Sequence, residues 1–134
     1  MPDSPAISAA TRLCAVMGNP IAHSLSPAIH NAAFRDLGLD YVFLAFRVTD
    51  VGNALNGLRA LDHFRGLSVT IPHKTTVLNY LDRVDDLSRI AGSINTIVND
   101  HGTLSGTSTD GPGALQALRE AHGLPDGLHV LVLG

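Results

Sequence analysis

The sequence predicts an α/β domain, a three-layer sandwich whose mainly parallel sheet contains one antiparallel strand. Short β-branched or apolar runs alternate with longer segments in which apolar residues recur at helical spacing. Two of the runs are joined by a hairpin-type turn at 99–102, which reverses one strand relative to its neighbour. A domain of 134 residues buries about two-thirds of its unfolded surface, so it needs no disulfide or metal to fold.

The first part of the chain is predicted to alternate strands with helices. One helix is expected to begin with Ser26 as its N-cap and Pro27 at its first helical position. Gly38 follows the last apolar residue of its periodic pattern. Asp50 caps the next helix, whose apolar residues recur at helical spacing. Pro72 ends a β-branched run and begins a third helix. The expected elements are strand 12–17, helix 27–37, strand 41–48, helix 51–61, strand 66–71 and helix 72–81.

The second part of the chain contains the antiparallel strand. Its hairpin turn reads Asn-Asp-His-Gly and lies between two short runs of strand type. The last run of the chain is continuously apolar and ends on a glycine, which is typical of the first strand of a dinucleotide-binding βαβ unit. The expected elements are helix 85–91, strands 93–98 and 103–106, helix 110–122 and strand 128–134.

Composition and charge narrow the classes of partner. The chain has 9 Lys and Arg against 12 Asp and Glu, a formal net charge of −3, which argues against nucleic acid. No apolar run approaches the roughly 20 residues of a membrane helix, and the N-terminal segment has an acid where a signal peptide has bases. We therefore expect a cytoplasmic protein with no membrane partner. The single cysteine, Cys14, is expected to pack in the core.

Polar residues between 18 and 31 form the first candidate ligand site. Ser24 and Ser26 place two hydroxyls beside free amides at a helix N-terminus, which suits a small carboxylate. The alternative is that Ser26 only caps the helix and that Ser24 is a solvated loop residue. His23 and His30 have no companion acid or thiol at ligand spacing, so we predict no metal site.

Lys74 is the only lysine of the chain, and the other eight bases are arginine. A lysine can release a proton in a suitable environment, whereas an arginine cannot. In the helix predicted after Pro72, Lys74 would lie in the first turn, where the helix dipole disfavours the charged ammonium. We therefore expect Lys74 to act as a general acid and base. The alternative is a solvated surface lysine.

Asn95 and Asp110 are the remaining polar candidates. Asn95 interrupts a strand pattern in which asparagine is depleted, so its amide is expected either to meet a ligand hydroxyl or to satisfy nearby loop backbone. Asp110 either caps the following helix or orients the Lys74 ammonium and accepts from a substrate hydroxyl. The glycines at 106, 111 and 113 do not match G-x-G-x-x-G, so we predict no phosphate loop there.

Four motifs occur in this order: G-N-P-I-A-H-S-L-S-P-A-I-H-N-A-A-F, S-V-T-I-P-H-K, A-G-S-I-N-T and G-T-S-T-D-G. In this combination the chain, from about residue 13 to 134, resembles the N-terminal substrate-binding domain of the shikimate dehydrogenase family. The resemblance implies reduction of 3-dehydroshikimate to shikimate with NADPH, in aromatic amino acid (chorismate) biosynthesis. It also implies that the substrate carboxylate meets Ser24 and Ser26, the ring hydroxyls meet Thr70, Asn95 and Asp110, and the catalytic acid/base is Lys74 paired with Asp110.

Two positions depart from the family pattern, because serine stands at Ser68 and Ser108 where the family commonly has asparagine. Shorter side chains there could shift recognition of the ring hydroxyls. Quinate or aminoshikimate dehydrogenase is therefore an alternative, although the unchanged Ser-Leu-Ser pair favours shikimate. A ligand-binding module that has lost catalysis is the alternative from another functional class.

The resemblance also divides the chain. Residues 1–126 would be the shikimate-binding catalytic domain, and 127–134 would be the first strand of a truncated Rossmann-type domain that binds NADP. Gly134 would be the first glycine of its phosphate loop. We therefore expect the chain alone to bind shikimate without turning it over. The apolar strand predicted at its end would favour self-association, for example as a homodimer.

Overall fold

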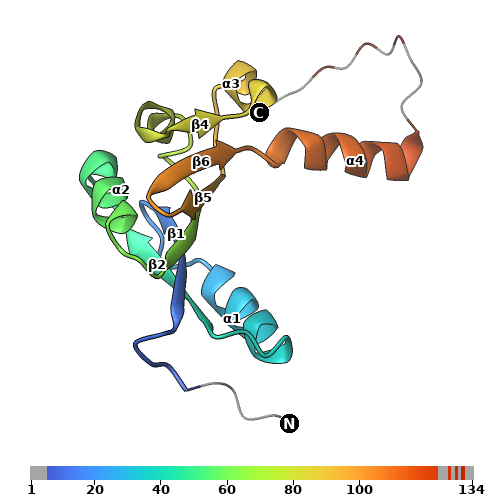
Figure 1. The fold of residues 1–134 in the computed structure, drawn as a ribbon. Helices are drawn as coiled ribbons and strands as arrows, with labels where there is room; N and C mark the ends of the chain where they lie inside the picture. The colour runs from blue at the N-terminus through green and yellow to red at the C-terminus, as the bar shows by residue number, and fades with distance from the viewer. Residues whose placement is uncertain (1–5, 124–126, 128, 130, 132–134) are drawn as a thin grey trace.

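The computed structural model describes residues 6–123 and residues 127, 129 and 131. Within these residues, six strands form one sheet in the order β2-β1-β3-β5-β6-β4, and helices lie on both of its faces (Figure 1). The strands are β1 (Arg12–Gly18), β2 (Tyr41–Arg47), β3 (Phe64–Val69), β4 (Arg83–Val84), β5 (Thr96–Asp100) and β6 (Thr103–Thr107). The helices are α1 (Ser26–Asp36), α2 (Val51–Arg59), the 3-10 helix η1 (Thr76–Tyr80), α3 (Asp86–Ala91) and α4 (Asp110–His122).

Strand β5 is the one described strand that runs antiparallel to its neighbours. It pairs with β3 and β6 in antiparallel register, whereas β1 with β2, β1 with β3 and β4 with β6 are parallel pairs. His101 and Gly102 join β5 to β6 with φ values of 48° and 89°, as a two-residue turn of type I′ requires. The predicted fold class is therefore confirmed.

The sheet separates two apolar clusters, which makes three layers. Along β1, Cys14 and Val16 face the cluster beside α1, while Ala15 and Met17 face the larger cluster that also contains Leu55 of α2. This alternation follows from the two-residue period of a strand. Cys14 is half-buried and packs against the smaller cluster, as expected for a core thiol.

The prediction of a helix at 72–81 is wrong. Residues 71–72 and 74–75 form turns, and only the short helix η1 follows before β4. The backbone explains the difference, because the Lys74 carbonyl accepts from the Ile94 amide at 2.8 Å instead of serving a helix. Strand β3 begins two residues earlier than expected, β5 begins at Thr96, and the short β4 was not predicted.

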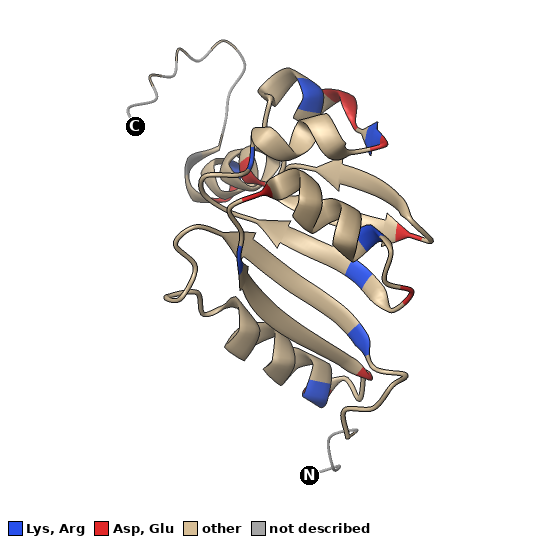
Figure 2. Cartoon of the chain, turned by 90° about the vertical axis from the view of Figure 1, so that its left-hand side faces the viewer, with Lys and Arg blue, Asp and Glu red and all other residues tan. Residues whose placement is uncertain are grey.

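Helix α4 extends away from the sheet (Figure 1). Its side chains from 110 to 121 are all exposed, including Leu115 and Leu118. Figure 2 shows that charged residues are sparse and lie mainly on helices and near strand ends. No helix of the described chain is long and apolar enough to cross a bilayer. The strand predicted at 128–134 lies outside the described residues, apart from 129 and 131, and stays a prediction.

Candidate functional site

The loops that follow β1 and β3 meet at the edge of the sheet where these parallel strands end. The Asn19 amide donates to the Ile71 carbonyl at 3.0 Å. Gly18 makes this approach possible, because a Cβ there would lie 2.5 Å from Cγ2 of Thr70. In open α/β sheets ligands bind at this edge, so the loops of the predicted motifs are gathered where a ligand is expected.

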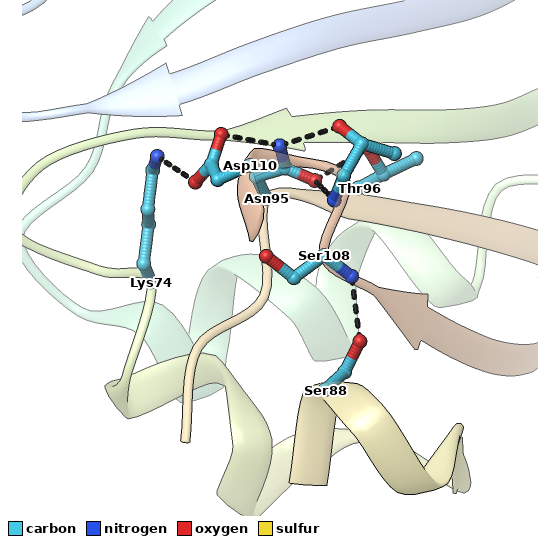
Figure 3. Close-up of polar contacts among 7 residues, drawn as sticks. Lys74, Ser88, Asn95, Thr96, Ser108 and Asp110 are labelled. Atoms are coloured by element: carbon cyan, nitrogen blue, oxygen red, sulfur yellow. Dashed lines mark hydrogen bonds and ion pairs between the residues drawn. The ribbon is translucent and has the colours of Figure 1, made fainter. Parts of the chain in front are cut away.

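A charged pair lies at this edge. Nζ of Lys74 donates to Oδ2 of Asp110 at 2.6 Å, and Nδ2 of Asn95 donates to Oδ1 of the same carboxylate at 2.9 Å (Figure 3). Each oxygen of Asp110 therefore has a donor, and the carboxylate is held between the ammonium and the amide. The structure brings together three of the residues predicted from sequence, which come from segments up to 36 residues apart.

Asn95 connects several segments of the site. Its Oδ1 accepts from the Thr109 amide at 3.1 Å and from the Thr96 hydroxyl at 2.9 Å, and its Nδ2 also donates to the Thr109 hydroxyl at 2.8 Å. Its backbone amide donates to the Thr107 carbonyl. The side-chain amide of Asn95 thus satisfies hydrogen-bonding groups of the neighbouring loop, which is one of its two expected roles. Its contact with a ligand hydroxyl remains a prediction.

The carboxyl of Asp110 has a lowered pKa, mainly because the Lys74 ammonium donates a hydrogen bond to it. Asn95 lowers this pKa further, and partial desolvation acts in the opposite direction. Asp110 is therefore ionised at neutral pH. The side chains of Lys74 and Asp110 are 31% and 53% exposed, so the pair is accessible to a ligand and contributes little to stability.

Helix α1 begins one residue earlier than predicted. Ser26 is its first residue and Leu25 its N-cap, so the prediction of Ser26 as the cap is wrong. The Ser24 hydroxyl instead accepts from the Ser26 amide at 3.3 Å. Within the described residues, no hydrogen bond joins Ser24, Ser26 or the Thr70 hydroxyl to the Lys74–Asp110 pair. Their contacts with substrate remain predictions.

Asp110 is also not the cap of its helix. The N-cap of α4 is Thr109, and Asp110 is the first helical residue, with its carboxylate turned to Lys74 and Asn95. Of the two roles expected for Asp110, the structure supports the one toward the lysine.

His73 is a supporting residue that sequence reasoning missed. It is 6% exposed, and its Nε2 donates to the Val48 carbonyl at 2.9 Å. The contact fixes the turn before Lys74 against the segment that links β2 to α2. In the sequence, only its position between Pro72 and Lys74 could have indicated this supporting role.

The described residues do not fit a dinucleotide site of the Rossmann type, because no G-x-G-x-x-G run follows any of their strands. Gly134, the predicted cofactor residue, lies outside the described part. In that part, no group of three or more His, Cys, Asp or Glu side chains is placed to hold a metal ion.

Residues 16–97 match the family model described as the shikimate dehydrogenase substrate binding domain. The chain belongs to the shikimate dehydrogenase family. The matched segment includes Lys74 and Asn95, and Asp110 follows it. The resemblance predicted from the four motifs is confirmed.

Similar proteins cover nearly all of the chain. The NADP(+) shikimate dehydrogenase of Moorella thermoacetica is 48% identical over 130 residues, 96% of this chain and 44% of the relative. A Listeria monocytogenes shikimate 5-dehydrogenase solved with shikimate and NAD has a TM-score of 0.80 and 46% identity, over 86% of this chain and 40% of that one. A shikimate dehydrogenase solved with NADP+ has a TM-score of 0.83 and 41% identity, and the match covers 93% of this chain and 44% of that one. The chain thus spans less than half the length of these relatives.

Proposed function

We propose that this chain is the substrate-binding domain of an enzyme that reduces 3-dehydroshikimate to shikimate. The observation that carries the proposal is the 2.6 Å contact between Lys74 and Asp110, at the ligand edge of a domain of this family. An accessible ammonium held by an ionised carboxylate is suited to meet an oxygen that gains negative charge.

Lys74 supplies the proton of the proposed reaction. When the substrate carbonyl carbon accepts a hydride, its oxygen gains a lone pair and takes a proton from the Lys74 ammonium, which becomes a neutral amine. In the reverse direction the amine takes the proton from the hydroxyl. Asp110 stays ionised and orients the ammonium. The hydride comes from a nicotinamide cofactor, for which the described residues offer no site.

The remaining contacts follow the family motifs. Ser24 and Ser26 lie at the start of α1, where backbone amides and the helix dipole favour a carboxylate. In the proposed complex, Thr70 and Asn95 meet ring hydroxyls beside Asp110. A complete enzyme of this kind uses NADP, as the names of the curated relatives suggest, and works in the cytoplasm. Residues 1–126 form its substrate domain, and 127–134 begin its cofactor domain.

Calorimetry on the 134-residue chain tests the substrate. We expect saturable binding of shikimate, weaker binding of quinate, and an affinity about tenfold lower for shikimate in Ser24→Ala, because a charge-assisted hydrogen bond to the carboxylate is lost. Ser105→Ala is the matched control, since the Ser105 hydroxyl makes no hydrogen bond among residues 6–123. Tighter binding of quinate or aminoshikimate than of shikimate would reassign the substrate, and binding of none of the three would refute the proposal.

A further inference from the structure

Ser88 is the single buried residue of helix α3. It is 1% exposed, while the other side chains of this helix are exposed to solvent. A buried hydroxyl is unfavourable unless it is hydrogen-bonded, so its partners show what it does.

The Ser88 hydroxyl links α3 to the segment that carries Asp110. It donates to Oδ2 of Asp85 at 2.6 Å and accepts from the backbone amide of Ser108 at 2.7 Å (Figure 3 shows the second contact). Asp85 also accepts from the Ser88 amide, and these two contacts are the main reason that the pKa of Asp85 is lowered to about 2. Asp85 is therefore a charged acceptor, which fixes the direction of the hydroxyl proton and leaves a lone pair for Ser108.

Two side chains thus hold consecutive amides just before Asp110. Ser88 accepts from Ser108, and Asn95 accepts from Thr109. The two anchors approach from different segments, because Ser88 belongs to α3 and Asn95 precedes β5. Without the Ser88 anchor, the Ser108 amide would have to move toward water or another acceptor. The carboxylate two residues further along would then lose its fixed position against Lys74.

We propose that Ser88 is a positioning residue, which through Ser108 sets the distance between the Asp110 carboxylate and the Lys74 ammonium. The catalytic consequence rests on the proposed function, whereas the geometric one does not. Ser88 touches neither Lys74 nor Asp110 in the hydrogen-bond network, so its effect has to pass through the backbone of 108–110.

The test is an NMR titration of the Asp110 carboxyl in the 134-residue chain, which requires no substrate. Ser88→Ala and the near-isosteric Ser88→Cys are expected to raise the pKa of Asp110 toward its ordinary value, because the Lys74 hydrogen bond weakens. Ser88→Thr, which keeps the hydroxyl, and Ser105→Ala are expected to leave this pKa unchanged. If Ser88→Ala does not fold, Ser88→Cys decides, because it preserves the packing but is a poor acceptor.

The same variants separate this inference from the proposed function. Ser88→Ala and Ser88→Cys should weaken shikimate binding about fivefold to tenfold, the loss of roughly one net hydrogen bond at the site. A raised Asp110 pKa in a chain that does not bind shikimate would support the positioning role while refuting the substrate. An unchanged Asp110 pKa in folded Ser88→Cys would overturn the positioning role, whatever the ligand.

Discussion

We expect replacement of Lys74 by methionine to lower turnover of 3-dehydroshikimate by about 10²- to 10⁴-fold, the range for loss of a general acid. Methionine keeps the length and apolar stem of the side chain and removes its only proton donor. The chain has no second lysine that could substitute. Turnover is measured in a fusion of this chain with the second half of the Moorella thermoacetica relative.

Lys74→Arg is the matched variant. Arginine keeps the positive charge near Asp110 but cannot release its proton near neutral pH. We expect Lys74→Arg to retain much of the shikimate affinity in calorimetry and to lose turnover almost as fully as methionine. Substantial turnover by Lys74→Arg would show that charge alone is needed, and the assignment of Lys74 as proton donor would be wrong.

The second large effect is expected for Asp110→Asn, with a loss of turnover of about 10- to 100-fold. The amide keeps the shape of the side chain but not the charge, so the hydrogen bond that orients the Lys74 ammonium loses its charge assistance. The stability of the fold should change little, because both side chains are partly exposed. Turnover and a urea denaturation curve on the same variant separate the two quantities.

Asp100→Asn is the control for this substitution. Asp100 is an exposed acid at the end of β5, on the hairpin away from the Lys74 site. It should change neither turnover nor stability. An Asp110→Asn variant as active as Asp100→Asn would contradict the role of the carboxylate.

The fold was predictable because its signals are local. Gly102 and its neighbours specify the hairpin, and the continuous apolar run of β1 indicates a strand buried on both faces. The helix predicted after Pro72 failed because its backbone groups find partners elsewhere in the chain. The Lys74 carbonyl accepts a hydrogen bond from the Ile94 amide, and the His73 ring donates one to the Val48 carbonyl. Such tertiary contacts override local propensity and leave no periodic trace in the sequence.

Three of the predicted site residues, Lys74, Asn95 and Asp110, lie together in the structure, but the hydrogen bonds that join them could not be predicted from the sequence. Lys74 was identified as the single lysine, and Asp110 by its place after a strand. That the Asn95 amide holds Thr109 and Asp110 together depends on how β5 and β6 pair, which motif spacing does not encode. The link from Ser88 to Ser108 spans 20 residues and likewise follows only from the packing of α3.

The central claim is that the sheet edge around Lys74 and Asp110 is where shikimate binds, and backbone NMR of the 134-residue chain tests it most directly. On addition of shikimate, we expect saturable shifts in the segments 18–26, 70–74 and 107–110, and their loss in Lys74→Met. The polar pocket beside Arg59 and Gly102 lies at the opposite edge and serves as the internal comparison. Shifts centred on that pocket, or no saturable shifts at all, would contradict the account.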